Sequence, residues 1–177
     1  MIVTMSVALL ILRLVAGLTV AAHGAQKLFG WFGGPGFTRM AKGLQTQGFR
    51  PAWLWTCLVI LGEFGGGLSL ALGFLTPLGA AGVFAAMLMA TIKVHWKNGF
   101  WNSKRGLEFP LSLMTIAVAI GISGPGNYSL DTLFGIVLPE TLLFCVLAVA
   151  ALLVDVIGLY SSRSAAITHP EVKPGNS

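Results

Sequence analysis

The sequence predicts an all-α membrane protein, a bundle of apolar helices that cross a lipid bilayer. Its 177 residues are 55% apolar and only 10% charged, whereas a soluble domain carries about 25% charged residues. The apolar residues also gather into five runs, each close to the roughly 20 residues that a helix needs to cross a bilayer. The chain is therefore long enough for one domain of five such helices and too short for several domains.

The runs place the ends of each expected helix. Pro77 and Pro139 lie where the first turn of a helix tolerates proline. The fourth run is the shortest, and Pro110 falls within its first turn. Residues 161–177 contain two prolines and are predicted as a flexible cytoplasmic tail. The single transmembrane domain, residues 1–160, is expected to consist of helices at about 2–22, 52–72, 77–94, 107–123 and 139–160.

Basic residues in the loops indicate how the chain crosses the membrane. Lys and Arg follow the first, third and fifth runs, whereas the turns after the second and fourth runs contain none. Because cytoplasmic loops collect Lys and Arg, this predicts a bacterial inner-membrane protein with its N-terminus outside and its C-terminus in the cytoplasm. The net charge of +5 is then expected to face anionic lipid head groups and not nucleic acid.

The loop between the first two runs has an amphipathic pattern. Within residues 29–49, Phe37, Met40, Ala41 and Leu44 fall on one helical face. This pattern predicts a short helix that lies in the membrane interface. A plain loop with scattered aromatic residues is the alternative.

Arg13 and Glu63 each fall near the middle of an expected helix. Arg13 also makes the first run a poor secretory signal, so this run is expected to be retained. An isolated charge at the bilayer centre costs several kcal/mol, and pairing is the usual remedy. We therefore predict that Arg13 and Glu63 pair and line a buried polar site. An ion pair that only fixes the helix register is the alternative.

A second polar cluster is expected at the cytoplasmic ends of the helices. His23 and Lys27 follow the first run, Lys93 and His95 end the third, and Glu108 opens the fourth. Histidine exchanges protons near neutral pH, so the cluster is suited to bind and protonate a quinone head group. Two histidines on separate helices also suit haem, but no further haem signature accompanies them. The alternative is that the lysines only snorkel and the histidines are interfacial.

Several kinds of chemistry have no motif in this sequence. It has no nucleotide-binding loop, no zinc-binding helix and no nucleophile elbow, and no metal site is predicted. A solute transporter would be expected to show an inverted repeat, which is not found. Redox work would therefore need a lipid-soluble carrier or a partner protein. The catalytic candidates are Arg13, His23, Glu63, His95 and Glu108.

Several short motifs occur in an order that resembles the DoxX family of small membrane proteins. The matching pieces are Arg13, then HGAQKLFG at 23–30, GEFGGG at 62–67, GFLTP at 73–77, residues 87–93, Glu108 and GPGNYSLD at 124–131. They cover roughly residues 8–131. The resemblance implies a four-helix transmembrane bundle, to which the run at 139–160 adds a fifth, C-terminal helix. Related subunits belong to thiosulfate:quinone oxidoreductase, and others are thought to act in membrane redox or thiol-linked complexes.

The resemblance also implies which residues form the site. The polar positions of the family fall on Arg13, His23, Lys27, Glu63, His95, Glu108 and Asp131. Together with the residue pattern, this predicts a quinone-interacting or redox-complex subunit. Its head-group-binding candidates are Arg13, His23, Lys27, Glu63, Lys93, His95 and Glu108.

The alternative function is a non-catalytic membrane anchor or scaffold that recruits a soluble redox partner through its basic inner face. The expected partners are the lipid bilayer, a soluble redox or thiol-linked protein, and further copies of this chain.

Overall fold

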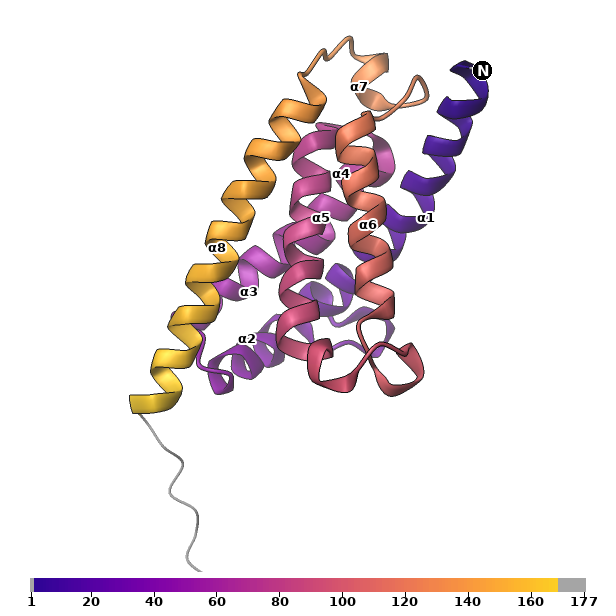
Figure 1. Ribbon diagram of the computed structural model, residues 1–177. Helices are drawn as coiled ribbons and strands as arrows, with labels where there is room; N and C mark the ends of the chain where they lie inside the picture. The colour runs from indigo at the N-terminus through magenta and orange to yellow at the C-terminus, as the bar shows by residue number, and fades with distance from the viewer. Residues whose placement is uncertain (1, 169–177) are drawn as a thin grey trace, which may run out of the picture.

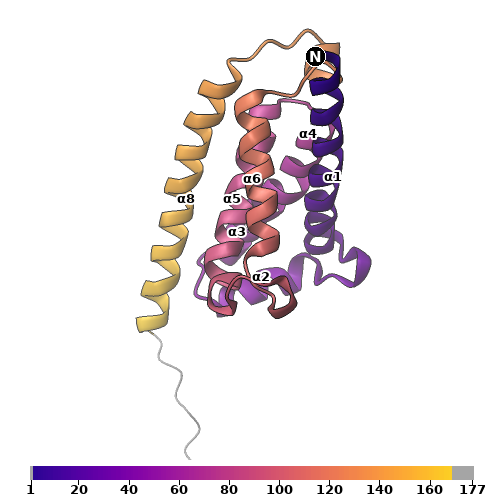
Figure 2. The same cartoon turned by 45° about the vertical axis from the view of Figure 1, so that its right-hand side comes forward.

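The long helices of the protein lie side by side as a bundle (Figures 1 and 2). The computed structural model describes the backbone of residues 2–168 and the side chains of residues 3–162. Within this range the chain contains helices and no strand, which confirms the predicted all-α class. The long helical segments are α1 (Ile2–Phe29), the continuous helix α3 (Ala52–Ile60), η2 (Leu61–Gly65) and α4 (Gly66–Leu72), then α5 (Thr76–Ala90) with η3 (Thr91–His95), α6 (Glu108–Ser123) and α8 (Glu140–Thr168).

Short elements close the two ends of the bundle. One end, named here the α2 end, carries η1 (Trp31–Gly33), α2 (Gly36–Thr46), η4 (Trp96–Asn98) and η5 (Asn102–Lys104). The opposite end, the α7 end, carries the N-terminus and α7 (Leu130–Leu133) (Figure 1). The predicted loop helix is present as α2, and Leu44 on its apolar face is buried.

Four of the described helical segments are long and apolar enough to cross a membrane. They are Val3–Phe29, Ala52–Leu72, Thr76–Asn98 and Glu140–Ser162. The fifth, α6, has 16 residues, yet it runs beside α5 between the two ends of the bundle (Figures 1 and 2). The chain therefore enters α1 at the α7 end and completes α8 at the α2 end, as an odd number of passes requires.

Two helices continue further than the sequence pattern indicated. Helix α1 extends past residue 22 to Phe29, where Gly30 adopts a left-handed conformation that ends it. Helix α8 extends to Thr168, so residues 161–168 are helical, although they were predicted as part of the tail. The hydroxyl groups of Ser161 and Ser162 donate to helix carbonyls one turn back. The rest of the expected tail lies outside the described residues.

Small side chains bring the helix backbones together in the core. Helix α5 lies at the centre and packs against α4, α6 and α8. A Cβ added to Gly62 would fall 2.8 Å from the carbonyl oxygen of Gly82, and one added to Gly66 would fall 3.1 Å from that of Gly79. Such close approach of glycine backbones is the usual way that helices associate where lipid removes the hydrophobic driving force.

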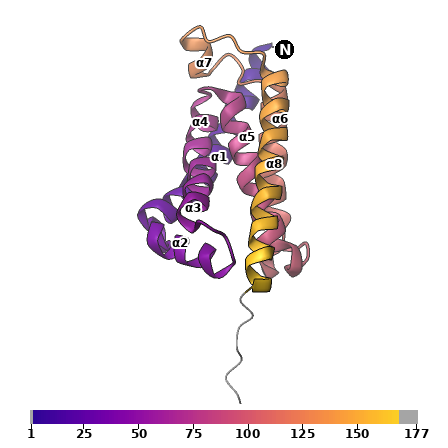
Figure 3. The same ribbon diagram turned by 90° about the vertical axis from the view of Figure 1, so that its left-hand side faces the viewer.

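Helix α8 covers one outer side of the bundle. It contacts α5 and, less extensively, α6, and it runs along the side of the molecule away from α1 (Figures 2 and 3). Many of its large apolar side chains are exposed, among them Leu142, Val149 and Ile157. This pattern is typical of a helix that faces lipid on most of its surface.

Candidate functional site

The register between α1 and the helix Ala52–Leu72 decides which charged residues meet. The two helices pack through glycines: a Cβ on Gly17 would fall 2.6 Å from the backbone nitrogen of Ala71, and one on Gly24 would meet Phe64. The two helices are antiparallel, since Gly17 lies beside Ala71 and Gly24 lies beside Phe64. Glu63 therefore lies beside the last turns of α1, whereas Arg13 lies beside the turn that follows Leu72.

The predicted contact between Arg13 and Glu63 is wrong. Glu63 pairs with Lys27, and Arg13 donates to the backbone carbonyl of Tyr128 at the α7 end. The prediction placed both charges at mid-membrane by counting residues along each apolar run. Helix α1 continues to Phe29, beyond its predicted end at residue 22. The middle of its apolar run therefore does not face the middle of the antiparallel helix Ala52–Leu72.

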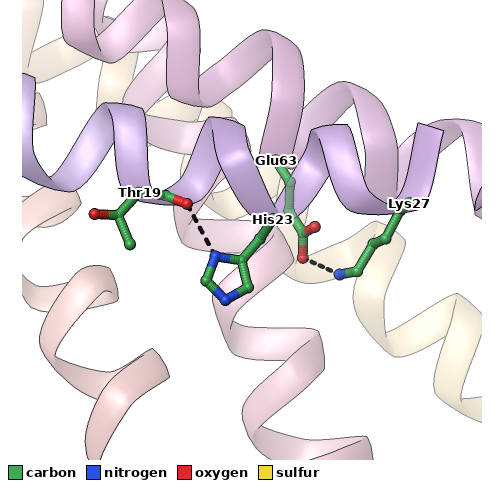
Figure 4. A network of polar contacts seen from close by, with 4 residues as sticks. All are labelled: Thr19, His23, Lys27 and Glu63. Carbon is green, nitrogen blue, oxygen red and sulfur yellow. Dashed lines mark hydrogen bonds and ion pairs between the residues drawn. The ribbon is translucent and has the colours of Figure 1, made fainter. Parts of the chain in front are cut away.

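Glu63, on the helix Ala52–Leu72, forms an ion pair with Lys27, in the last full turn of α1 (Figure 4). The Glu63 side chain is 2% exposed and that of Lys27 is 24% exposed. Only one Glu63 oxygen, Oε1, accepts from the Lys27 Nζ; the other, Oε2, is buried and has no hydrogen-bond partner among the described residues. A buried carboxylate oxygen without a partner is costly, so this atom is the first candidate for a ligand contact.

His23 lies one turn before Lys27 on the same side of α1 (Figure 4). Its Nδ1 is 2.9 Å from the carbonyl oxygen of Thr19, and the Nδ1 of His95 is 2.6 Å from the carbonyl oxygen of Arg105. A carbonyl only accepts, so Nδ1 is the donor in both rings. In the neutral imidazole Nε2 is then an acceptor. Both histidines thus have Nε2 available to accept a proton or a hydrogen bond.

A cavity of about 530 Å³ joins these groups between α1, α5, α6 and η2. We call it the inner pocket. Four of the predicted residues line it: His23, Lys27, Glu63 and His95. Its apolar wall comes from α1, α5 and α6, and includes Val20, Met87, Ala90, Val94, Phe109, Pro110 and Leu113. An apolar cleft with a few convergent polar groups is the usual form of a small-molecule site.

Two polar residues of the inner pocket, Glu63 and His95, lie in π-helical segments. Glu63 lies in η2 and His95 lies in η3. A π-turn adds one residue to the helical turn and redirects the side chains that follow, and such turns are frequent at functional sites. In this protein they bring a carboxylate and an imidazole from two different helices to one cavity.

Two other predicted residues lie at the same end but do not line the inner pocket. The Lys93 Nζ donates to the Ser162 hydroxyl, 2.6 Å away, and lies 4.9 Å from the centre of the Phe49 ring. The Lys93 side chain therefore extends to α8, away from the inner pocket. Glu108 accepts a hydrogen bond of 2.9 Å from the backbone N–H of Asn102 and so ties down the loop before α6.

Arg13 and Asp131 belong to a separate node at the α7 end. Both are buried, with exposed fractions of 0% and 1%. Asp131 Oδ1 accepts from the Leu75 N–H at 2.7 Å, and Oδ2 accepts from the N–H and the hydroxyl of Thr76 at 3.0 and 2.7 Å. The carboxylate therefore caps the first turn of α5. The Arg13 guanidinium occupies the space that a Cβ on Gly73 would need, which locks this turn onto α1.

The loop before α6 adds polar groups to the inner pocket that no sequence pattern indicated. Asn98, Asn102 and Arg105 line the cavity beside the histidines. The Asn98 side-chain amide donates to the Arg105 carbonyl at 3.1 Å, the same carbonyl that holds His95. Their proximity to His95 in the sequence was the only available signal, since no motif spacing marks them.

Comparison with known proteins identifies the family. The DoxX family model matches residues 8–96, half of the chain. This segment contains Arg13 and all four predicted residues of the inner pocket, but ends before Glu108 and the motif at 124–131. No curated protein and no solved structure matches the chain significantly. The protein is therefore a member of the DoxX family.

Proposed function

We propose that this DoxX-family membrane protein binds the head group of a quinone in the inner pocket and serves as the quinone-interacting subunit of a redox complex. The observation that carries the proposal is the buried Glu63 Oε2, which has no hydrogen-bond partner within the described part of the chain and belongs to a residue lining a cavity with two imidazoles. Quinone carbonyls accept hydrogen bonds and quinol hydroxyls donate them. The pocket offers partners for both forms.

Each polar residue has a place in this proposal. The Lys27 ammonium has three donors and one carboxylate partner, so it can also donate to a quinone carbonyl. Glu63 Oε2 and the histidine Nε2 atoms can accept from a quinol hydroxyl. The apolar wall from α5 and α6 suits the flat ring.

Reduction of a quinone to a quinol takes up two electrons and two protons. We infer that the protons pass through His23 and His95, because each ring is fixed by a backbone carbonyl at Nδ1 and its Nε2 has no hydrogen-bond partner among the residues that the structure describes. The electrons would come from a flavin or dithiol on a soluble partner that docks at the α2 end. Under this proposal the α2 end faces the cytoplasm of a bacterial inner membrane, and His23, His95, Glu63 and Lys27 are the residues nearest the chemistry.

The test is the affinity of a short-chain quinone for the protein in lipid nanodiscs. We expect Glu63→Gln and Lys27→Met each to raise the Kd at least about tenfold, because each removes a charged partner worth about 1.5 kcal/mol or more. Glu108→Gln is the matched control, since it changes another carboxylate at the same end that lies outside the inner pocket. Equal affinity in all four proteins would reject the inner pocket as the quinone site.

The second candidate function is a non-catalytic scaffold. It is favoured by six basic side chains that are all exposed at the α2 end: Arg39, Lys42, Arg50, Lys97, Lys104 and Arg105. An exposed basic surface suits an acidic soluble partner. This function predicts that a redox protein co-purifies while neither the native protein nor its complex binds or reduces quinone.

A further inference from the structure

The most deeply placed polar atom that the inner pocket leaves for a ligand is a hydrogen-bond acceptor. Glu63 is buried, whereas the other polar residues that the structure describes along the wall are half-buried or exposed. Glu63 Oε1 accepts from the Lys27 ammonium, and Oε2 has no hydrogen-bond partner among the described residues. A carboxylate held in an ion pair can only accept. A ligand group that reaches Oε2 must therefore bring a donor.

The two imidazoles add two further acceptors. The Nδ1 of His23 donates to the Thr19 carbonyl at 2.9 Å, and the Nδ1 of His95 donates to the Arg105 carbonyl at 2.6 Å. A neutral imidazole has one donor and one acceptor, so Nε2 is the acceptor in both rings. Each histidine thus offers a ligand the same kind of atom as Glu63 does.

The tautomer of His95 depends on an unusual backbone conformation. Arg105 has a φ of 60°, in the left-handed region that residues other than glycine rarely adopt. Two backbone hydrogen bonds of 3.0 Å within residues 99–107 close the loop around it. In this conformation the Arg105 carbonyl accepts from His95 Nδ1 and also, at 3.1 Å, from the Asn98 amide. The left-handed residue therefore holds the carbonyl that makes His95 Nε2 an acceptor.

The donors that line the inner pocket are more exposed or already engaged. Asn102 and Arg105 have exposed side chains, and the Lys27 side chain is 24% exposed. The Asn98 amide already donates to the carbonyls of Val94 and Arg105. Donors that reach water have a partner whichever ligand is bound, whereas the buried Glu63 Oε2 depends on the ligand. The acceptors therefore decide which ligand binds best.

We propose that the inner pocket prefers the reduced form of its ligand, so that a quinol binds more tightly than the matching quinone. This inference rests on the proposed quinone site and adds the redox form that the site selects. A quinol hydroxyl both donates and accepts, whereas a quinone carbonyl only accepts. The quinol can therefore accept from Lys27 as the quinone does, and can also donate to Glu63 Oε2 or to a histidine Nε2. A quinone oxygen at the same place would set acceptor against acceptor.

The test compares the Kd values of a short-chain quinol, its quinone and the dimethyl ether of the quinol, with the full-length protein in nanodiscs under anaerobic conditions. The ether keeps both oxygens but has no donor. We expect the quinol to bind at least about tenfold more tightly than either of the others, which corresponds to about 1.4 kcal/mol. The midpoint potential of the bound quinone–quinol couple should then rise by about 30 mV for each factor of ten, because two electrons are transferred.

The preference and the quinone site can fail separately. If the quinone binds as tightly as the quinol, or more tightly, the preference is wrong and the quinone site stands. If neither form binds, the quinone site itself is wrong and the preference falls with it.

The ratio of the quinone Kd to the quinol Kd separates the preference from a general loss of affinity. Glu63→Gln replaces one acceptor oxygen by an amide donor, so the quinol should lose more affinity than the quinone and the ratio should fall toward one. Glu108→Gln is the matched control, because it makes the same change outside the inner pocket, and should leave the ratio unchanged. An unchanged ratio in Glu63→Gln would overturn the proposal.

The tautomer of His95 gives a second readout, which needs no ligand. Nitrogen NMR of histidine-labelled native protein should show the neutral His95 ring with its proton on Nδ1. Arg105→Val and Arg105→Asn remove the same charge, but valine disfavours the left-handed conformation and asparagine tolerates it. We expect the valine variant, checked for folding by thermal unfolding, to shift the proton toward Nε2 and to lower the Kd ratio, and the asparagine variant to keep both. A native His95 with its proton on Nε2 would contradict the proposal.

Discussion

At the scale of single residues, the cost of burying charge explains which side chains have partners. Lys27 meets Glu63 at the α2 end, and Arg13 meets the Tyr128 carbonyl with Asp131 nearby at the α7 end. Glu63 thus belongs with Lys27 of the predicted cytoplasmic-end cluster, and Arg13 belongs to a separate node at the α7 end, so the predicted mid-membrane pair does not form. The node at the α2 end lines a cavity, and the other closes a turn.

A double-mutant cycle measures this arrangement. Lys27→Met and Glu63→Gln should be coupled by about 1.5–3 kcal/mol in the free energy of unfolding, since the pair forms a charged hydrogen bond. Unfolding in mixed micelles gives the values. The cycle of Arg13→Met with Glu63→Gln is the control and should show coupling below about 0.5 kcal/mol, as expected for distant sites. A large coupling in the control would restore the Arg13–Glu63 contact.

The α7-end node gives a graded prediction. Asp131→Asn keeps one oxygen for the Leu75 N–H but loses an acceptor for Thr76, and Asp131→Ala loses both. The stability should therefore fall in the order native, Asn, Ala, with the Ala variant losing at least about 2 kcal/mol because the cap of α5 is gone. Thermal unfolding in detergent measures the order. An Ala variant as stable as the native protein would show that Asp131 does not cap α5.

At the scale of elements, glycine sets how closely the helices approach. Gly17 and Gly67 lie across the contact between α1 and α4, and a Cβ on Gly67 would fall 2.5 Å from the backbone nitrogen of Ala21. In contrast, Gly43 on α2 has open space around its Cβ position. The same substitution should therefore have opposite effects at the two sites.

We expect Gly67→Ala to destabilise the protein by about 1–3 kcal/mol through overpacking. Gly43→Ala should stabilise it by about 0.5–1 kcal/mol, because alanine loses less backbone entropy in a helix. Unfolding of both variants in the same detergent gives the comparison. If Gly67→Ala were neutral, the close contact between α1 and α4 would not exist in the membrane.

The sequence predicted the helices better than their contacts. The predicted apolar runs fall on the long helices of the structure. The cost of charge in lipid singled out Glu63, and the polar residues at the helix ends, together with the family resemblance, singled out His23, Lys27 and His95. The pairing could not be predicted, since it depends on where α1 ends and on the antiparallel register set by Gly17, Gly24 and Gly67. The π-turns η2 and η3 leave no periodic signal in the sequence either. The orientation of the Glu63 and His95 side chains therefore could not be predicted from it.

At the scale of the whole molecule, charge is distributed unevenly between the two ends. The exposed Lys and Arg side chains of the described chain lie at the α2 end, whereas Asp131 and Glu140 lie at the α7 end. From the positive-inside rule we expect the α2 end to face the cytoplasm. The inner pocket would open to that side.

Cysteine labelling tests this orientation. In a protein freed of Cys57 and Cys145, which are both exposed, Gln45→Cys marks the α2 end and Asn127→Cys marks the α7 end; both side chains are exposed. A membrane-impermeant maleimide should label Asn127→Cys on intact cells and Gln45→Cys only after permeabilisation. The reverse pattern would invert the topology.

We propose above that a quinone head group binds between Lys27, Glu63 and the two histidines. The most direct measurement is photolabelling of the protein in nanodiscs with a photoreactive quinone, followed by mapping of the labelled peptides. We expect label within residues 20–27, 87–95 and 109–113, and its loss in Glu63→Gln but not in Glu108→Gln. Label found only outside the inner pocket, or spread evenly over the lipid-facing helices, would show that the quinone does not bind there.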